Sequence, residues 1–218
     1  MDAFTTNISR NVVNWIKDHL NGEIPKYRDE SIPKLKVVVE FERVATTKLR
    51  AFEGYFHPSV RIIYITVQVP SELDLTQLNS FIPKFKEVLR HELEHFRQSQ
   101  RQGSTHYKSQ ELTRYNHQNG VGAITGPYIS AAAAREYFLM PEEVEAWVMG
   151  LYKRAKGSKE PLMALLRQES AAIAKRLLVY KVDPGEAKKV SEEILFRWKE
   201  YARKRLSGLA TSEFGVLD

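Results

Sequence analysis

Two stretches of this chain alternate apolar and polar residues, and they constrain its fold more than any other feature. Residues 34–43 read KLKVVVEFER and residues 59–69 read SVRIIYITVQV. In an extended strand every second side chain faces the same side, so each stretch would present one apolar face. Gly54 and the pair His57-Pro58 punctuate the chain between them. The pattern predicts a small, mostly antiparallel sheet of about three strands.

Outside these strands the apolar residues recur with the period of an α-helix. They predict a first helix over residues 6–20 and, after Pro70, a long helix that ends near Gln102. Four further helices are predicted over residues 130–139, 141–156, 160–179 and 184–206. A sheet followed by separate helices indicates an α+β fold.

The composition indicates the cellular compartment in which the protein works. The chain has no cysteine, which excludes disulfides and thiolate metal sites and suits a reducing compartment. Its first residues lack the pattern of a signal peptide, and no apolar run approaches the roughly 20 residues of a membrane helix. We therefore expect a soluble, cytoplasmic protein.

The net charge of +6 is concentrated in the last third of the chain. Residues 151–218 hold 15 lysines and arginines against 9 acidic residues, whereas residues 1–150 hold 18 of each. Together with Trp198 and Tyr201, the run Arg203-Lys204-Arg205 leaves open a weak contact with nucleic acid. In the alternative interpretation, the basic residues form a solvated face and the two aromatic residues pack in a core.

The long predicted helix carries the motif His-Glu-x-x-His within VLRHELEHFRQSQ, residues 88–100. Side chains four residues apart project from the same side of a helix, so His91 and His95 could both reach one zinc ion at about 2.0–2.1 Å. Glu92 is turned by about 100° from His91 and would lie beside the metal. From there it could act as the general base that activates a zinc-bound water.

The rest of this helix supports its placement in a folded domain. Glu94 and Arg97 lie outside the ligand set, and we expect them to face solvent or to support the ligands. Apolar residues form a stripe along the helix, which predicts that one side is buried: Phe85, Val88, Leu89 and Phe96.

A catalytic zinc site needs a third protein ligand and one open position. The extended metzincin motif would require a glycine and a histidine where this chain has Gln98 and Arg101, so that subclass is excluded. The remaining candidates are His106, His117 and the acidic group at residues 142–145.

Within the acidic group, helical periodicity leaves two candidates close. Glu143 shares a face with small residues, Ala146 and Gly150, which would permit a close approach to the zinc helix. Glu145 is followed instead by an apolar stripe formed by Val148, Met149 and Tyr152. Periodicity alone does not separate the two.

The sequence HELEH, followed 48 residues after His95 by Glu143-Val-Glu-Ala146, resembles the gluzincin pattern of zinc metallopeptidases. It is similar to small bacterial and phage metallopeptidases, including the ImmA/IrrE type. Residues 52–67, FEGYFHPSVRIIYITV, also resemble the glycine-then-strand segment before their active-site helix. The likeness covers roughly residues 50–150. It implies zinc bound by His91, His95 and Glu143, peptide-bond hydrolysis with Glu92 as general base, and a host cytoplasmic location if the protein is phage-encoded.

The resemblance also implies a domain organisation. A zincin-like domain would cover residues 1–156, with its sheet packed on the active-site helix. Residues 157–206 would form a basic helical extension packed on that domain, and residues 207–218 a tail. The alternative function is a zinc-containing module that binds nucleic acid or protein and has no peptidase activity.

Two further parts of such a site remain open in the sequence. If the strand over residues 60–69 lay at the sheet edge, it could bind an extended peptide as an added strand, but it could equally be internal. The donor that stabilises the oxyanion of the transition state could be any of four residues: Tyr115, His117, Tyr128 or Tyr137.

Overall fold

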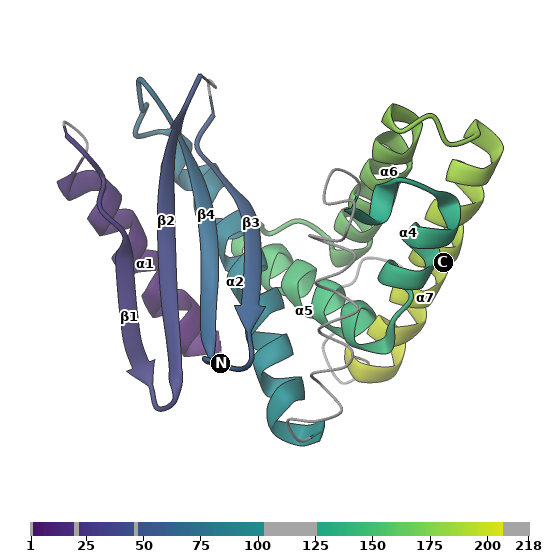
Figure 1. Cartoon of the computed structure of the whole chain (residues 1–218), viewed down its shortest axis with the longest axis horizontal. Helices are drawn as coiled ribbons and strands as arrows, with labels where there is room; N and C mark the ends of the chain where they lie inside the picture. Colours follow the sequence, from purple (N-terminus) through teal and green to yellow (C-terminus); the bar gives the residue numbers. More distant parts are fainter. Residues whose placement is uncertain (1, 20–21, 46–47, 103–125, 207–218) are drawn as a thin grey trace. The chain divides into compact units, whose positions relative to one another are not determined.

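The computed structural model describes four stretches of the chain (Figure 1): residues 2–19, 22–45, 48–102 and 126–206. The chain divides into two compact units, which are described separately. The first comprises residues 1–100 and 152–159, and the second comprises residues 101–151 and 160–218. Neither unit is one continuous segment, and the domain boundaries at residues 156 and 206 stay predictions.

The first unit is built on a four-stranded mixed sheet, which confirms the α+β class. Its strands are β1 (Tyr27–Ile32), β2 (Leu35–Val44), β3 (Arg50–His57) and β4 (Ile62–Pro70), in the order β1-β2-β4-β3. Strand β2 pairs in parallel with β4, while the β1–β2 and β3–β4 pairs are antiparallel. Strand β1 reads YRDESI and buries only its first residue, so it lacks the alternating pattern that a sequence search requires.

Strand β4 is internal to this sheet, and β3 lies at the edge (Figure 1). The possibility that residues 60–69 form the edge is therefore wrong. The reason is the hairpin: β3 folds back on β4 with Tyr55 opposite Tyr64, while β2 occupies the other side of β4. Any additional strand would have to pair with β3 or β1.

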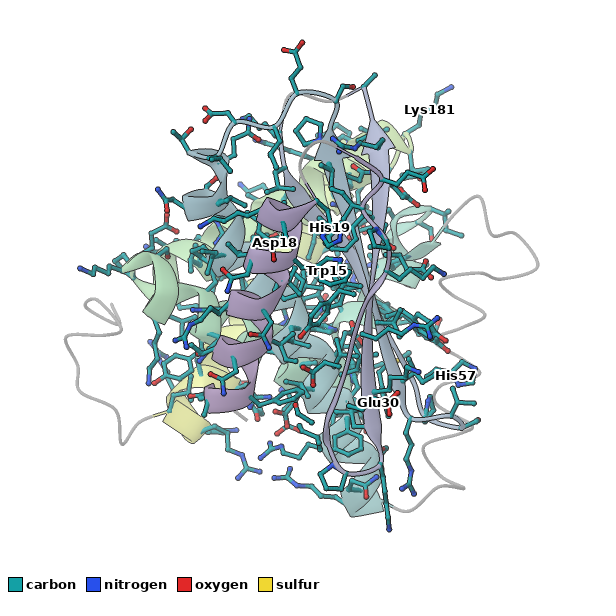
Figure 2. All side chains as sticks on the ribbon, turned by 90° about the vertical axis from the view of Figure 1, so that its left-hand side faces the viewer. Trp15, Asp18, His19, Glu30, His57 and Lys181 are labelled. Carbon is teal, nitrogen blue, oxygen red and sulfur yellow. The ribbon has the colours of Figure 1, made fainter. Side chains whose placement is uncertain are left out.

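Two helices, α1 (Asp2–Asp18) and α2 (Gln77–Gln102), lie on one face of the sheet (Figure 1). Trp15 of α1 donates a hydrogen bond to the Pro25 carbonyl oxygen at 3.0 Å, and Figure 2 shows it between α1 and the sheet. Between β3 and α2, Phe56 packs edge-on against Phe96. The fully buried residues Val37, Val39, Ile63 and Ile65 complete this core from one face of the sheet.

The second unit is helical, and its helices confirm the four predicted after residue 129. They are α4 (Ala131–Phe138), α5 (Pro141–Ser158), α6 (Leu162–Val179) and α7 (Pro184–Leu206), preceded by the short η1 (Gly126–Tyr128). Trp198 is fully buried and stacks on Trp147 at a centroid distance of 5.6 Å. The expectation that Trp198 is a core residue is thereby confirmed. The last turns of α5, from Tyr152 onward, belong to the first unit.

Across the part of the chain that the structure describes, none of the helices is both long and apolar enough to cross a membrane.

Candidate metal site

Helix α2 brings the two histidines of the motif together, as the i, i+4 spacing predicts. The Nε2 atoms of His91 and His95 lie 3.0 Å apart. The His95 side chain is fully buried, while the His91 side chain remains 12% exposed. Two imidazole nitrogens this close can bind the same ion, because each would need a bond of only about 2.0–2.1 Å to a zinc at their meeting point.

Glu143, in the first turn of α5, completes a group of three potential metal ligands. One ligand atom from each of His91, His95 and Glu143 lies within 4.8 Å of the other two. Glu143 is fully buried. Pro141 suits the first position of α5, since its fixed φ is helical and it has no N–H to satisfy. The three residues are close enough to hold a metal ion, and among the described residues no other group of three or more does so.

Glu145, the rival third ligand, is engaged elsewhere in the second unit. Its Oε1 accepts a hydrogen bond from the Tyr201 hydroxyl at 2.8 Å and lies 3.7 Å from Nη1 of Arg101. The structure thus brings Glu143, and not Glu145, to the two histidines. His106 and His117, the other candidates, lie outside the described residues.

Glu92 lies beside the histidine pair, as its position in the motif predicts. It is 3% exposed, and its Oε1 is 3.9 Å from Nε2 of His91. That distance is too long for a hydrogen bond but short enough for a single water molecule to contact both groups. Glu92 therefore lies next to the histidine pair without belonging to the group of three residues that could hold a metal ion.

Strand β3 approaches the motif closely at Gly54. A Cβ atom on Gly54 would lie 2.6 Å from Cγ1 of Val88 and 2.9 Å from Cγ of Glu92, both shorter than real Cβ contacts. Only glycine therefore fits between the sheet edge and this face of α2. The sequence marked Gly54 as a break between strands and as part of the glycine-then-strand resemblance, whereas the structure places it within β3, packed against α2.

Replacing Gly54 with alanine is expected to destabilise the protein by about 1–3 kcal/mol, the usual cost of overpacking. The stiff, branched Val88 side chain cannot yield without moving α2 or β3. Urea unfolding measures the effect. The matched control is Gly157→Ala on α5, where the nearest atom to an added Cβ is 3.6 Å away and alanine favours the helix. Equal stability of the two variants would contradict the packing argument.

A buried ionic cluster surrounds the motif on α2. Glu94 is fully buried and accepts a 2.7 Å hydrogen bond from Nη1 of Arg90, which is itself largely buried, and a further one from Nε of Arg97. Of the two expectations for Glu94, that it faces solvent is wrong, and that it supports the ligands stays a prediction. Burial of this carboxylate is tolerated because guanidinium groups one helical turn away on either side compensate its charge.

Of the four candidates for the oxyanion donor, the two in the described part of the chain, Tyr128 and Tyr137, both have partners within the second unit. The Tyr128 hydroxyl accepts a 2.7 Å hydrogen bond from Arg176 in the second unit, and burial raises the pKa of Tyr128. Tyr137 is buried and packs edge-on against Phe138. The remaining candidates, Tyr115 and His117, lie outside the described residues.

Comparison of the chain with protein-family models, with curated proteins and with solved structures found no match.

Proposed function

We propose that this protein is a zinc-dependent metallopeptidase. The observation that carries the proposal is the convergence of His91, His95 and Glu143, with the carboxylate of Glu92 beside them. Two imidazoles and one carboxylate are a ligand set that zinc prefers, and three protein ligands leave a fourth position for water or substrate. The gluzincin resemblance of HELEH and Glu143-Val-Glu-Ala146 points the same way.

Zinc bound here would polarise the scissile carbonyl and lower the pKa of a bound water to about 7. Among the side chains of the protein, Glu92 would carry out the proton transfer: it would accept a proton from the attacking water and deliver it to the leaving amine. Burial of His95 and Glu143 and the small exposure of His91 would keep most solvent away from the reacting atoms.

The sheet edge suggests how a peptide substrate would bind. Strand β3 is the edge strand of the four-stranded sheet, and Gly54 brings its backbone next to Glu92. An extended peptide added along β3 would form main-chain hydrogen bonds while its own backbone passes the general base. In this proposal β3, and not the strand over residues 60–69, binds the extended peptide as an added strand.

The direct test is the metal content of the protein purified without added metal or chelator. We expect about one zinc per chain, because zinc held by three protein ligands in a folded site survives purification. Elemental analysis of a folded sample measures it. A value below about 0.2 zinc per chain, with no recovery on addition of zinc, would contradict the proposal.

The alternative of a nucleic-acid- or protein-binding module without peptidase activity retains less support than it had from the sequence. Trp198 is inside the second unit, and the Tyr201 hydroxyl is hydrogen-bonded to Glu145. Neither is free to stack on a base, although Arg203 and Lys204 are exposed on α7. A weak contact of these basic residues with nucleic acid stays a prediction.

A further inference from the structure

Gln98 is a buried polar residue to which the motif assigns no role. It follows His95 by three positions on α2, so both side chains lie on the same side of the helix. Gln98 is 3% exposed, and its Oε1 lies 2.8 Å from Nδ1 of His95. This hydrogen bond lies on the side of the imidazole opposite to His91.

The contact defines which nitrogen of His95 carries the hydrogen. An amide oxygen only accepts, so Nδ1 of His95 must be the donor. In a neutral imidazole the other nitrogen, Nε2, then holds the lone pair. Nε2 is also the atom that faces Nε2 of His91 at 3.0 Å. The Gln98 oxygen therefore selects the tautomer in which His95 can bind a metal at this point.

The same side chain in the opposite orientation would have the opposite effect. If the amide group of Gln98 were turned, its NH₂ would donate to Nδ1 and the hydrogen of His95 would move to Nε2. That hydrogen would block the metal. Residue 98 must therefore present a hydrogen-bond acceptor to Nδ1 of His95. A side chain that only fills the same volume would not fix the tautomer.

We propose that Gln98 is a positioning residue, which fixes the orientation and tautomer of His95 for metal binding; the proposal rests on the metal site of the proposed function. Metal-bound histidines generally donate their second N–H to a carboxylate, a carbonyl or a water, and loss of that partner weakens binding. Here the acceptor is a neutral amide from the next turn of the same helix, so a single rigid element holds both the ligand and its support.

Two substitutions of Gln98 distinguish the effect of its hydrogen-bond acceptor from the effect of its volume. Gln98→Leu keeps a side chain of similar size and removes the oxygen. Gln98→Glu retains an oxygen acceptor and adds a negative charge, which raises the basicity of the histidine. Gln100→Leu is the matched control, because Gln100 is an exposed glutamine on the same helix.

The first measurement is the tautomer of His95 in the metal-free protein, read from its ring nitrogen-15 chemical shifts. We expect hydrogen on Nδ1 in the parent, in Gln98→Glu and in Gln100→Leu, and loss of this preference in Gln98→Leu. Hydrogen on Nε2 in the parent would overturn the proposal. Because no metal is present, this result does not depend on the proposed function.

The second measurement is zinc affinity, obtained by competition with a chromophoric chelator. We expect Gln98→Leu to bind zinc about 10–100-fold more weakly than the parent. Gln98→Glu and Gln100→Leu should bind at least as tightly as the parent. Equal affinity of Gln98→Leu and Gln100→Leu would overturn the positioning role while leaving the zinc site intact. A parent that binds no zinc would instead refute the proposed function.

Circular dichroism of each variant controls for folding. If Gln98→Leu fails to fold, the comparison between Gln98→Glu and the parent decides. A folded Gln98→Glu protein that binds zinc more weakly than the parent would overturn the proposal, because it still presents an acceptor to His95.

Discussion

Glu92→Gln is expected to retain zinc and to lose peptide hydrolysis by at least about 10²–10⁴-fold, the usual contribution of a general base. Glutamine has almost the same shape and can still contact a water, but its amide cannot take up a proton. The proposed metal ligands His91 and His95 are unchanged, so zinc content should match that of the parent. Turnover of a mixture of quenched fluorescent peptides, with zinc measured on the same samples, tests both halves of the expectation.

The matched control for this variant is Glu94→Gln. Both glutamates are buried on α2, but Glu94 pairs with Arg90 and Arg97, whereas Glu92 lies beside His91. Its substitution should lower thermal stability, because it leaves the buried Arg90 guanidinium without its counter-charge. Folded Glu94→Gln protein should still hydrolyse peptides. If Glu92→Gln retains parental turnover, Glu92 has no part in the mechanism.

The second large effect is expected at the third ligand. Glu143→Ala should weaken zinc binding by more than the roughly 10–100-fold typical of a residue that only supports a ligand. The carboxylate lies within reach of both imidazoles and is fully buried, so water cannot easily replace it without a cavity. Zinc titration of the folded variant against a competing chelator measures the loss.

Its controls are the two neighbouring glutamates. Glu145→Ala should bind zinc as the parent does and should instead lose stability, because it removes the partner of the Tyr201 hydroxyl. Glu142 is half-buried on α5, and Glu142→Ala should change neither the zinc affinity nor the stability by much. If Glu145→Ala loses zinc while Glu143→Ala keeps it, the third ligand is two residues away from our assignment. If none of the three alanine variants loses zinc affinity, the third ligand lies outside α5.

The helices and the histidine pair could be predicted because they depend on local spacing. An i, i+4 pair on a helix faces one side whatever the rest of the fold does, and His91 and His95 meet for that reason. Glu143 and Glu145 could not be separated in this way, because α5 is buried on several sides: Ala146, Val148 and Leu151 are all fully buried. They are distinguished by contacts with distant parts of the chain: Glu143 lies near the two histidines, and Glu145 binds Tyr201, 56 residues later.

The sheet order was beyond local reasoning for a similar reason. The parallel pairing of β2 with β4, and hence the placement of β3 at the edge, depends on contacts between distant segments. The solvent-facing alternative for Glu94 was wrong, although a lone carboxylate does favour solvent. Its two arginine partners are visible in the sequence at i−4 and i+3, and that spacing is the signal that could have indicated its burial.

The distance along the chain between the ligands has a consequence for chain entropy. His95 and Glu143 are 48 residues apart, so an ion bound to both would close a loop of that length, much as a cross-link does. The entropic cost of closing a flexible loop grows only logarithmically, by about 0.6 kcal/mol for each doubling of its length. The segment that joins the two ligand helices could therefore lengthen or shorten considerably at little thermodynamic expense. A ligand pair of this kind leaves the intervening sequence free to diverge, which would make the spacing between the histidines and the glutamate a poor guide to kinship.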